Sequence, residues 1–314
     1  MGRFLLRRLL SVAFTLVTVS LVVFAVTEIL PGDVATMILG QQATPEDLAT
    51  LRIKLGLNRP AYVRYIEWVG GLLRGDWGRS LRLGLSVGPL LVQRLRNSLA
   101  LAVLACIVGV PTSVLLGVVA GMERDLWPDL LISVGTLVAV SLPEFVTGVF
   151  LIIVFASWLH WLPPSSLIEP EANLLESLQH LVLSVATLEL GMLAHIARMT
   201  RSSMAEVMES NYIRTAILKG LPMRTVVFQH ALRNALLPTI TIVAINVGWL
   251  MGGLVVVESV FAYPGLGQLL LFAVGNHDVP LLQAVTLLIA AIYSLSNSAA
   301  DLLYHYANPR IRSH

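Results

Sequence analysis

The residue types that carry catalytic chemistry do not form a recognisable site in this sequence. No His-Glu-x-x-His metal motif and no Gly-x-Ser-x-Gly nucleophile elbow occurs. The two lysines, Lys54 and Lys219, lie outside any glycine-rich phosphate-binding loop. The histidines are scattered without the close spacing of metal ligands: His160, His180, His195, His230, His277, His305 and His314. The sequence therefore predicts no catalytic residue, no metal site and no cofactor bound by the chain itself.

Three glutamates, Glu144, Glu189 and Glu258, stand within or beside otherwise apolar stretches. A carboxylate is costly in lipid, so each is expected to face the protein interior, a cavity or an interface. Glu258 can also lie simply at the outer end of its apolar stretch. His195 occupies an apolar stretch as well, and both a functional role and a role in helix packing are open for it.

A polar and basic segment, Ser210–Pro238, separates two long apolar stretches and is predicted to form two short helices. Ser210 or Asn211 can cap the first helix by accepting hydrogen bonds from its first amides. Gly220 is suited to end this helix in a left-handed conformation, and Pro222 can begin the next one. Such an element lies on a membrane surface or docks into another protein. The helical period places Tyr212, Ile213, Ala216 and Ile217 on one face, with Arg214, Thr215 and Lys219 largely on the other.

The composition of the chain places these elements in a membrane protein. Of the 314 residues, 56% are apolar and only 13% are charged, and the mean hydropathy is +0.79. This balance is too apolar for a soluble domain and fits an all-α polytopic membrane protein. The single cysteine, Cys106, lies in an apolar run and is predicted to be a small buried hydrophobic residue.

Six stretches are long and apolar enough to be predicted transmembrane helices. The first, which follows Arg7 and Arg8, could instead belong to a signal peptide, but no small-residue cleavage site follows it, so an uncleaved span is expected. The third stretch is interrupted by Pro143 and Glu144. The stretches are Leu9–Thr27, Asn97–Met122, Leu130–Trp158, Leu181–Ala197, Ala235–Val257 and Val279–Ala300.

The spans divide the chain into four predicted parts. Residues 1–30 form a cytosolic N-terminus and the first span, and residues 31–96 form a long extracytoplasmic segment with helices near 44–55 and 62–73. Residues 97–305 form a five-span core with a cytosolic loop at 204–235, and residues 306–314 form a cytosolic tail. The loops His160–Gln179 and Phe261–Asp278 lack lysine and arginine, whereas the 204–235 loop and its flanks are basic, which places both termini in the cytosol.

Two pairs of glycines spaced four residues apart predict close contacts between helices. They are Gly117 with Gly121 and Gly248 with Gly252, each pair inside an apolar stretch. Small residues at this spacing allow helix backbones in a membrane to approach closely.

Several motifs along the chain occur in the order and spacing of a known family. The chain resembles the inner-membrane permease subunits of peptide-type ABC importers, of the dipeptide, oligopeptide and nickel class, and in particular the B permease of the pair. The motifs are Pro31-Gly32-Asp33, Leu55-Gly56-Leu57-Asn58-Arg59-Pro60, Gly71–Ser80, Tyr212–Ala216, Lys219-Gly220, His230–Pro238, Val257–Phe261, Tyr263–Gly267, Asp301–Tyr304 and Asn308–Arg312.

The resemblance implies a type I ABC importer fold and a role for the basic segment. In that family the corresponding loop forms a coupling helix, here 210–222, that sits in a groove of the ATPase subunit. Arg214 and Thr215 depart from the general Glu-Ala-Ala pattern, as they do in peptide-type members. The implied coupling residues are Tyr212, Arg214, Thr215, Ala216, Lys219 and Gly220, and the candidates for the translocation path are Glu144, Glu189 and Glu258.

The resemblance also implies the partners of the chain. These are a second permease subunit, expected to be different from this chain, two ATPase subunits that bind ATP and Mg, and an extracytoplasmic solute-binding protein. The expected location is a bacterial or archaeal inner membrane, with lipid but no nucleic acid as a further partner. A secondary transporter that works without an ATPase is the alternative, and it would be expected to show half-chain repeats and intramembrane ion sites.

Overall fold

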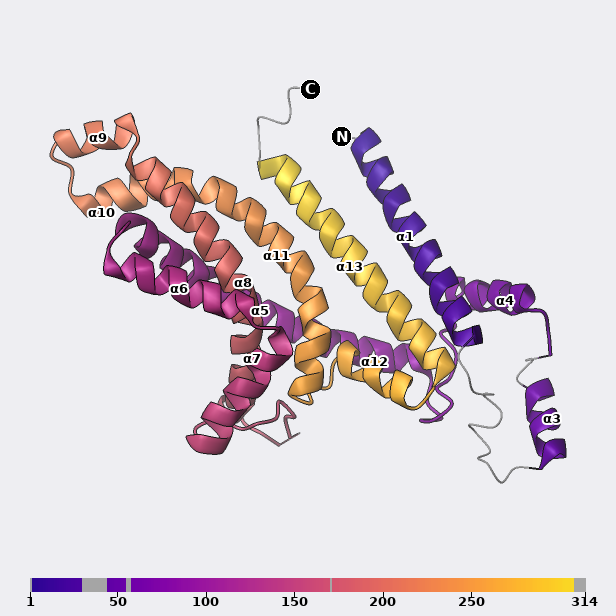
Figure 1. Ribbon diagram of the computed structural model, residues 1–314. Helices are drawn as coiled ribbons and strands as arrows, with labels where there is room; N and C mark the ends of the chain where they lie inside the picture. Colours follow the sequence, from indigo (N-terminus) through magenta and orange to yellow (C-terminus); the bar gives the residue numbers. More distant parts are fainter. Residues whose placement is uncertain (1, 30–43, 55–57, 170, 308–314) are drawn as a thin grey trace. The chain divides into compact units, whose positions relative to one another are not determined.

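A computed structural model describes residues 2–29, 44–54, 58–169 and 171–307, and these residues are mainly α-helical (Figure 1). Within these ranges the only β-type pairing is an isolated bridge between Arg79 and Ser86. The predicted motifs at 31–33 and 308–312, the first part of the motif at 55–60 and the tail at 308–314 lie outside the described residues. The chain forms two compact units, one comprising Met1–Asn97 and Pro264–Ser294, the other Ser98–Tyr263 and Leu295–His314.

The first unit packs around the start of α5 and the helices near the C-terminal end of the chain. Its core contains Val87, Leu91, Leu266, Leu281 and Val285, all at most 4% exposed. The segment Phe261–Asp278 is not the loop predicted from the sequence, because its apolar middle part forms the helix α12. The helices of this unit are α1 (Gly2–Ile29), α3 (Pro45–Lys54), α4 (Ala61–Leu73), the first part of α5 (Val87–Met122), α12 (Leu266–Gly275) and the first part of α13 (Val279–Ala307).

A buried aspartate ties the loop after α4 to the start of α13. The carboxylate of Asp278 accepts hydrogen bonds from the Ser80 hydroxyl and from the amides of Leu81 and Arg82, the latter two at 3.2 Å. Asp278 is fully buried, so these donors replace the water that its charge would otherwise need. The contact joins residues almost 200 positions apart in the chain, and no local sequence pattern indicated it.

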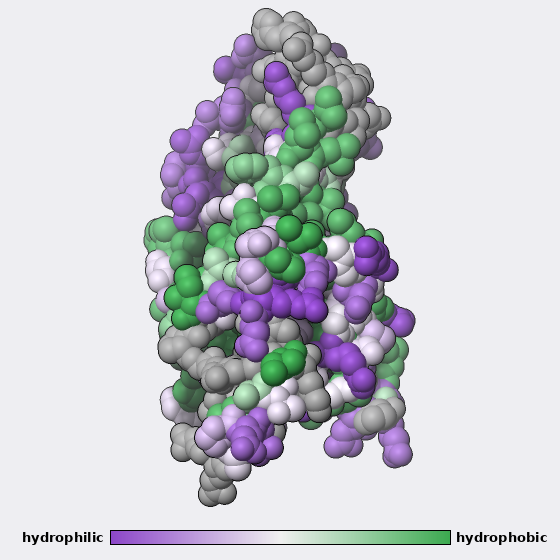
Figure 2. Space-filling view, turned by 90° about the vertical axis from the view of Figure 1, so that its right-hand side faces the viewer, coloured by the Kyte–Doolittle hydropathy of each residue, from purple (hydrophilic) through white to green (hydrophobic). Residues whose placement is uncertain are grey.

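The helices α1 and α4 meet through an aromatic cluster. The ring of Phe24 lies 5.3 Å from that of Tyr65 and 6.1 Å from that of Trp68, and the Tyr65 hydroxyl is 2.8 Å from that of Ser20. Most of the remaining surface of α1 is apolar and exposed, and Phe14, for example, is 74% exposed. Figure 2 shows hydrophobic residues gathered in a broad area on this side of the molecule, bordered by hydrophilic ones. This surface suits contact with lipid.

The second unit is organised around α8, which contacts α5, α6, α7 and α11. Leu188 and Ile196 of α8 and Leu254 and Val257 of α11 are core residues at most 4% exposed. α8 starts inside the predicted polar loop, where Asn173 and Glu176 form a capping box. Besides the rest of α5 and the end of α13, the helical elements are α6 (Trp127–Ser141), α7 (Glu144–Leu151), the π-helical η1 (Ile152–Trp158), α8 (Leu174–Met208), α9 (Asn211–Leu218), α10 (Met223–Thr225), the π-helical η2 (Val226–Ala231) and α11 (Leu232–Val260).

Two glycines bring α5 into backbone contact with α8, as the sequence predicted. A Cβ atom at Gly117 would lie 2.5 Å from the carbonyl oxygen of Ala197, and one at Gly121 would lie 2.8 Å from that of Arg201. The two glycines of the second pair have different surroundings. A side chain at Gly248 would overlap the amide oxygen of Asn297, whereas Gly252 faces open space.

The third predicted span is broken into two helices. Within the described residues five helices are long and apolar enough to cross a membrane, and α6 with the α7–η1 run forms a sixth candidate bent by 108° at Pro143. This pair follows α8 along its length, because Asp129 binds Arg201, Glu144 lies beside Gly191, and Ser166 after η1 bonds to Ser184. The interval from Arg201 to Ser184 spans about 25 Å of helix, close to the roughly 30 Å of a bilayer core. The pair therefore crosses as one broken span, and the predicted six spans are confirmed.

One prediction concerns the close contact of α5 with α8. Because an added methyl at Gly117 must push apart two backbones, we expect Gly117→Ala to lower the free energy of unfolding by about 1–3 kcal/mol. The matched control is Gly252→Ala, whose methyl meets nothing within 4 Å. Thermal unfolding of the detergent-solubilised proteins compares the two variants. Equal melting temperatures for both variants would contradict this packing.

Candidate functional site

The helix α9 is held by a small apolar cluster at one end of the second unit. Ile213 is fully buried and Ala216 is 8% exposed, and both pack with Val226, Val227 and Met204. Two other residues predicted on this face, Tyr212 and Ile217, are 44% and 45% exposed. The predicted apolar face is thus too wide, because the main packing of α9, against η2 and the end of α8, buries Ile213 and Ala216 but leaves Tyr212 and Ile217 exposed.

Both ends of α9 lie near their predicted positions. Ser210 occupies the N-cap position, but its hydroxyl donates to the carbonyl of Val207 instead of capping the helix, so the predicted cap interaction is wrong for Ser210. At the other end Gly220 has φ +77°, and its amide donates to Ile217 at 2.9 Å. The predicted left-handed end at Gly220 is confirmed. A Cβ there would meet no atom within 4 Å, so the backbone conformation and not space requires the glycine.

A hydrogen bond connects α9 directly to the span that follows it. The side-chain amide of Asn234, in the first turns of α11, donates to the Tyr212 hydroxyl at 2.9 Å. The link to the preceding span is short, because α8 ends at Met208 and α9 begins at Asn211. α9 is therefore attached to both α8 and α11.

The outer face of α9 has a mixed basic and apolar character. Arg214, Thr215 and Lys219 are exposed, as the sequence predicted. Leu218 is 81% exposed, although it is one of the most apolar residues of the helix. Leu218 is not among the residues predicted from the sequence. It lies outside the helical period of the predicted apolar face, and this position indicates an exposed apolar side chain.

An ion pair below α9 was not predicted. Arg201 of α8 donates two hydrogen bonds to Asp129 of α6, the Nη2–Oδ2 one at 2.6 Å, and Asp129 also accepts from Ser133 and from the amide of Asp125. The side chain of Asp129 is 5% exposed and that of Arg201 is 30% exposed. Nearby, Arg124 and Glu209 form an exposed pair at 2.6 Å. These contacts attach both α6 and the turn between α5 and α6 to the end of α8.

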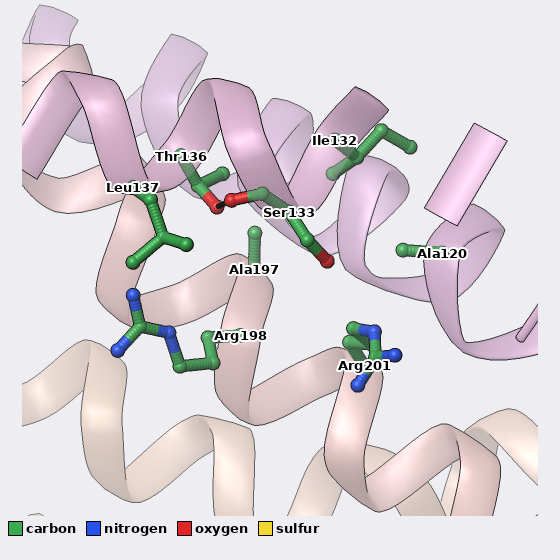
Figure 3. Close-up of a pocket in the computed structure, with 8 residues that line it drawn as sticks. All are labelled: Ala120, Ile132, Ser133, Thr136, Leu137, Ala197, Arg198 and Arg201. Atoms are coloured by element: carbon green, nitrogen blue, oxygen red, sulfur yellow. Dashed lines mark hydrogen bonds between the residues drawn. The ribbon is translucent and has the colours of Figure 1, made fainter. Parts of the chain in front are cut away.

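A pocket of about 220 Å³ opens beside this ion pair, between α5, α6 and α8 (Figure 3). Its walls combine aliphatic side chains with two hydroxyls and two arginines. Figure 3 shows the side chain of Arg198 extending from α8 next to Leu137 of α6. The lining residues are Ala120, Ile132, Ser133, Thr136, Leu137, Ala197, Arg198 and Arg201.

The three glutamates predicted in the membrane have different surroundings. Glu258 is 1% exposed and accepts a hydrogen bond from the Ser98 hydroxyl. Glu189 is half-buried, accepts from Thr112 of α5 and packs against Gly109. The structure thus provides partners for two of the three carboxylates. Just beyond α11, burial and the nearby charge of Glu258 raise the pKa of the Tyr263 hydroxyl to about 12.

Glu144, at the start of α7, lies between two glycines of the neighbouring helices. A Cβ atom at Gly253 of α11 would lie 2.6 Å from its Oε2 atom, and one at Gly191 of α8 would lie 3.3 Å from its Oε1 atom. His195, one turn further along α8 from Gly191, meets the ring of Trp249 edge-on at 5.4 Å. The three glutamates therefore lie in the same unit but do not converge on one site. No cluster of metal-ligating side chains occurs in the described part of the chain.

Comparison with known proteins identifies the family of the chain. The model of the binding-protein-dependent transport system inner membrane component matches residues 113–313, and that of its N-terminal region matches residues 1–109. The chain belongs to this family of inner membrane transport components. It is a permease subunit of the peptide-type ABC importer class, and the permease component of such a system is not itself catalytic.

Similar proteins cover the chain almost completely. A protein of Sinorhizobium fredii named probable peptide ABC transporter permease protein y4tP is 38% identical over 99% of this chain and all of its own length. The dipeptide transport system permease protein DppB of Alkalihalophilus pseudofirmus is 36% identical over 98% of both chains. The glutathione transport system permease protein GsiC of Salmonella typhimurium is 36% identical over 99% of both chains. These matches leave the secondary-transporter alternative without support.

A prediction follows from the buried ion pair. Asp129→Asn leaves Arg201 without its counter-charge, so we expect a loss of about 3 kcal/mol in the free energy of unfolding. Arg124→Gln is the matched control, because it breaks an exposed pair worth less than about 1 kcal/mol. Thermal unfolding in detergent measures both. A variant at Asp129 as stable as the Arg124 variant would show that the ion pair does not hold α6 to α8.

Proposed function

We propose that this permease forms half of the translocation path of an importer for peptides, and that α9 couples it to an ATPase subunit. The observation that carries the coupling role is the construction of α9. Two side chains anchor it, Tyr212 ties it to α11, and its basic and apolar outer face has no packing partner among the described residues. A helix held in this way can transmit a movement of its partner into the membrane.

The movement would pass to two spans together. α9 follows α8 after two residues and is bonded to α11 through Asn234. Thr200 of α8 and Thr239 of α11 share a hydrogen bond at 3.1 Å, so the two spans are also joined directly inside the bundle. ATP binding in the partner must favour one conformation of the transporter over another for transport to occur.

The substrate class is proposed from the relatives, whose names refer to peptides, dipeptides and glutathione. The proposed complex contains a second, different permease, two ATPase subunits that bind ATP and Mg, and an extracytoplasmic solute-binding protein. Residues 31–96 would lie outside the cytosol and face that binding protein. The 204–235 loop, both termini and the 306–314 tail would be cytosolic.

Among the candidate path residues, Glu144 has the strongest case. Glu189 and Glu258 accept hydrogen bonds from Thr112 and Ser98, and these contacts explain them as structural residues of the helix bundle. No hydrogen bond or ion pair joins Glu144 to the residues that the structure describes. An acidic residue at membrane depth without an internal partner indicates a functional site.

A single charged substitution on the outer face of α9 tests its proposed contact with the ATPase subunit. Leu218→Asp places a carboxylate on the proposed contact, and we expect at least about tenfold less ATPase subunit to co-purify with the membrane-inserted variant. Leu85→Asp is the matched control, because Leu85 is 55% exposed in the proposed extracytoplasmic segment. Equal recovery of the ATPase with Leu218→Asp and Leu85→Asp would count against α9 as the docking element.

The left-handed end of α9 provides a second test. Proline cannot adopt the φ of +77° found at Gly220 and lacks the amide that donates to Ile217. We expect Gly220→Pro to abolish ATP-dependent uptake in membranes while insertion is unchanged. Gly220→Asn is the control, since asparagine tolerates this conformation, and it should retain most uptake. Uptake by Gly220→Pro at the wild-type rate would reject the coupling role of this turn.

A further inference from the structure

The pocket between α5, α6 and α8 contains a positive charge that no residue in the described ranges balances. Arg198 and Arg201 both line it, and none of its lining side chains is acidic. Arg201 is paired, because its Nε and Nη2 atoms donate to Asp129. Arg198 makes no hydrogen bond or ion pair with any described residue. The pocket therefore carries a net positive charge, that of Arg198.

The pocket lies near the level where a membrane passes from hydrocarbon to headgroups. Arg201 is at one end of the roughly 25 Å of α8 that the broken span follows, close to one face of the bilayer core. Ala120 lies two residues before the end of α5 at Met122. Trp127, at the start of α6, is 72% exposed, and tryptophan is enriched at membrane interfaces. A ligand in this pocket is therefore within reach of lipid headgroups.

Aliphatic side chains continue from the pocket along α6. Leu137, which lines the pocket, is 50% exposed, and Val134 is 49% exposed. Positions three apart are neighbours on a helix surface, so these two side chains form an open apolar strip. The pocket itself has a volume of about 220 Å³, which corresponds to about seven water molecules. This is room for a small polar headgroup, and the strip outside it suits an acyl chain.

Two hydroxyl groups add hydrogen-bond acceptors to the pocket. The Ser133 hydroxyl donates to Asp129 at 3.1 Å, and the Thr136 hydroxyl donates to the carbonyl of Ser133 at 2.9 Å. Their protons are therefore used, but each oxygen can still accept a hydrogen bond. Figure 3 shows these hydroxyls and the guanidinium of Arg198 on different sides of the pocket. The pocket thus offers N–H donors to an anion and acceptors to a hydroxyl group.

These features distinguish between possible ligands. A phosphodiester provides anionic oxygens for a guanidinium group, and a glycerol headgroup provides hydroxyls for the acceptors. A headgroup with an ammonium would bring a second positive charge next to Arg198. Inorganic phosphate would use Arg198 but would leave the apolar strip without a role. The combination fits a phospholipid whose headgroup is anionic.

We propose that this pocket binds the headgroup of an anionic phospholipid, with its phosphate on Arg198 and its headgroup hydroxyls on Ser133 and Thr136. Phosphatidylglycerol has this chemistry. The lipid would connect α6 to α8 beside the pair of Asp129 and Arg201. The assignment of the lipid to the cytosolic leaflet rests on the proposed function and its orientation, whereas the binding itself does not.

The test measures lipid binding to the full-length permease in detergent by native mass spectrometry. The probes are dioleoyl phosphatidylglycerol and dioleoyl phosphatidylethanolamine at equal concentrations, with inorganic phosphate as a competitor. The variants are Arg198→Gln and Leu137→Asn. Their matched controls are Arg233→Gln and Leu131→Asn, at exposed positions outside the pocket.

We expect the wild type to retain phosphatidylglycerol over phosphatidylethanolamine by at least about fivefold, the effect of one basic residue near an anionic headgroup. Arg198→Gln should bring this ratio close to one, and Leu137→Asn should weaken the binding of phosphatidylglycerol. Both controls should keep the wild-type ratio. Arg198→Gln should also keep the wild-type melting temperature in lipid-free detergent, because Arg198 has no partner among the described residues.

Three results would overturn the assignment. An equal loss of preference in Arg198→Gln and Arg233→Gln would indicate a general attraction to the basic surface. Displacement of the lipid by millimolar inorganic phosphate would indicate a site for a soluble anion. Binding to the isolated chain but not to the complete transporter would show that the second permease covers the pocket.

The proposed function fails in a different way. A permease that binds phosphatidylglycerol through Arg198 but recovers no ATPase subunit from membranes would reject the importer function and leave the lipid site standing. The two failures are therefore distinguishable.

Discussion

Charged side chains inside a membrane have no water to solvate them, and the second unit depends on how its chain meets that constraint. Asp129 and Arg201 satisfy each other, and the hydroxyls of Thr112 and Ser98 serve Glu189 and Glu258. Each of these contacts joins two different helices. The polar groups therefore determine which helices pack together and at which level. Apolar side chains distinguish less well between a neighbouring helix and lipid, because lipid is equally apolar.

Glycine complements these polar contacts by controlling distance. Gly117 and Gly121 let α5 lie against the backbone of α8, and Gly191 and Gly253 let the carboxylate of Glu144 lie against the backbones of α8 and α11. The first pair makes a permanent contact, because a side chain there would collide with backbone atoms. The second pair makes a space that the carboxylate of Glu144 fills. The same residue type thus supports both a helix contact and the placement of a candidate path residue.

The coupling proposal requires that a small helix outside the membrane act on long helices inside it. α9 has only two buried anchors, yet the hydrogen bond from Asn234 and the short link to α8 connect it to both neighbouring spans. Thr200 and Thr239 continue this connection inside the bundle. A rigid body of α8, α9 and α11 is a simple means of converting closure of an ATPase dimer into a change in the membrane path.

The sequence by itself determined the membrane class, the six apolar stretches, the position of α9 and the left-handed turn at Gly220. These features depend on hydropathy, helical period and local backbone preference, which act over a few residues and can be identified from short segments. The order of the motifs also predicted the family, which the comparisons confirmed.

Only the tertiary structure decided which polar groups meet. Asp129 and Arg201 are 72 residues apart, and nothing near either residue indicates the other. In the sequence Glu144, Glu189 and Glu258 are equivalent candidates. The packing of α5, α8 and α11 distinguishes them, because it provides hydrogen-bond donors for Glu189 and Glu258. The 108° bend between α6 and α7 and the apolar helix α12 likewise depend on neighbours distant in the chain. Such contacts form only when helices have packed, so no local pattern encodes them.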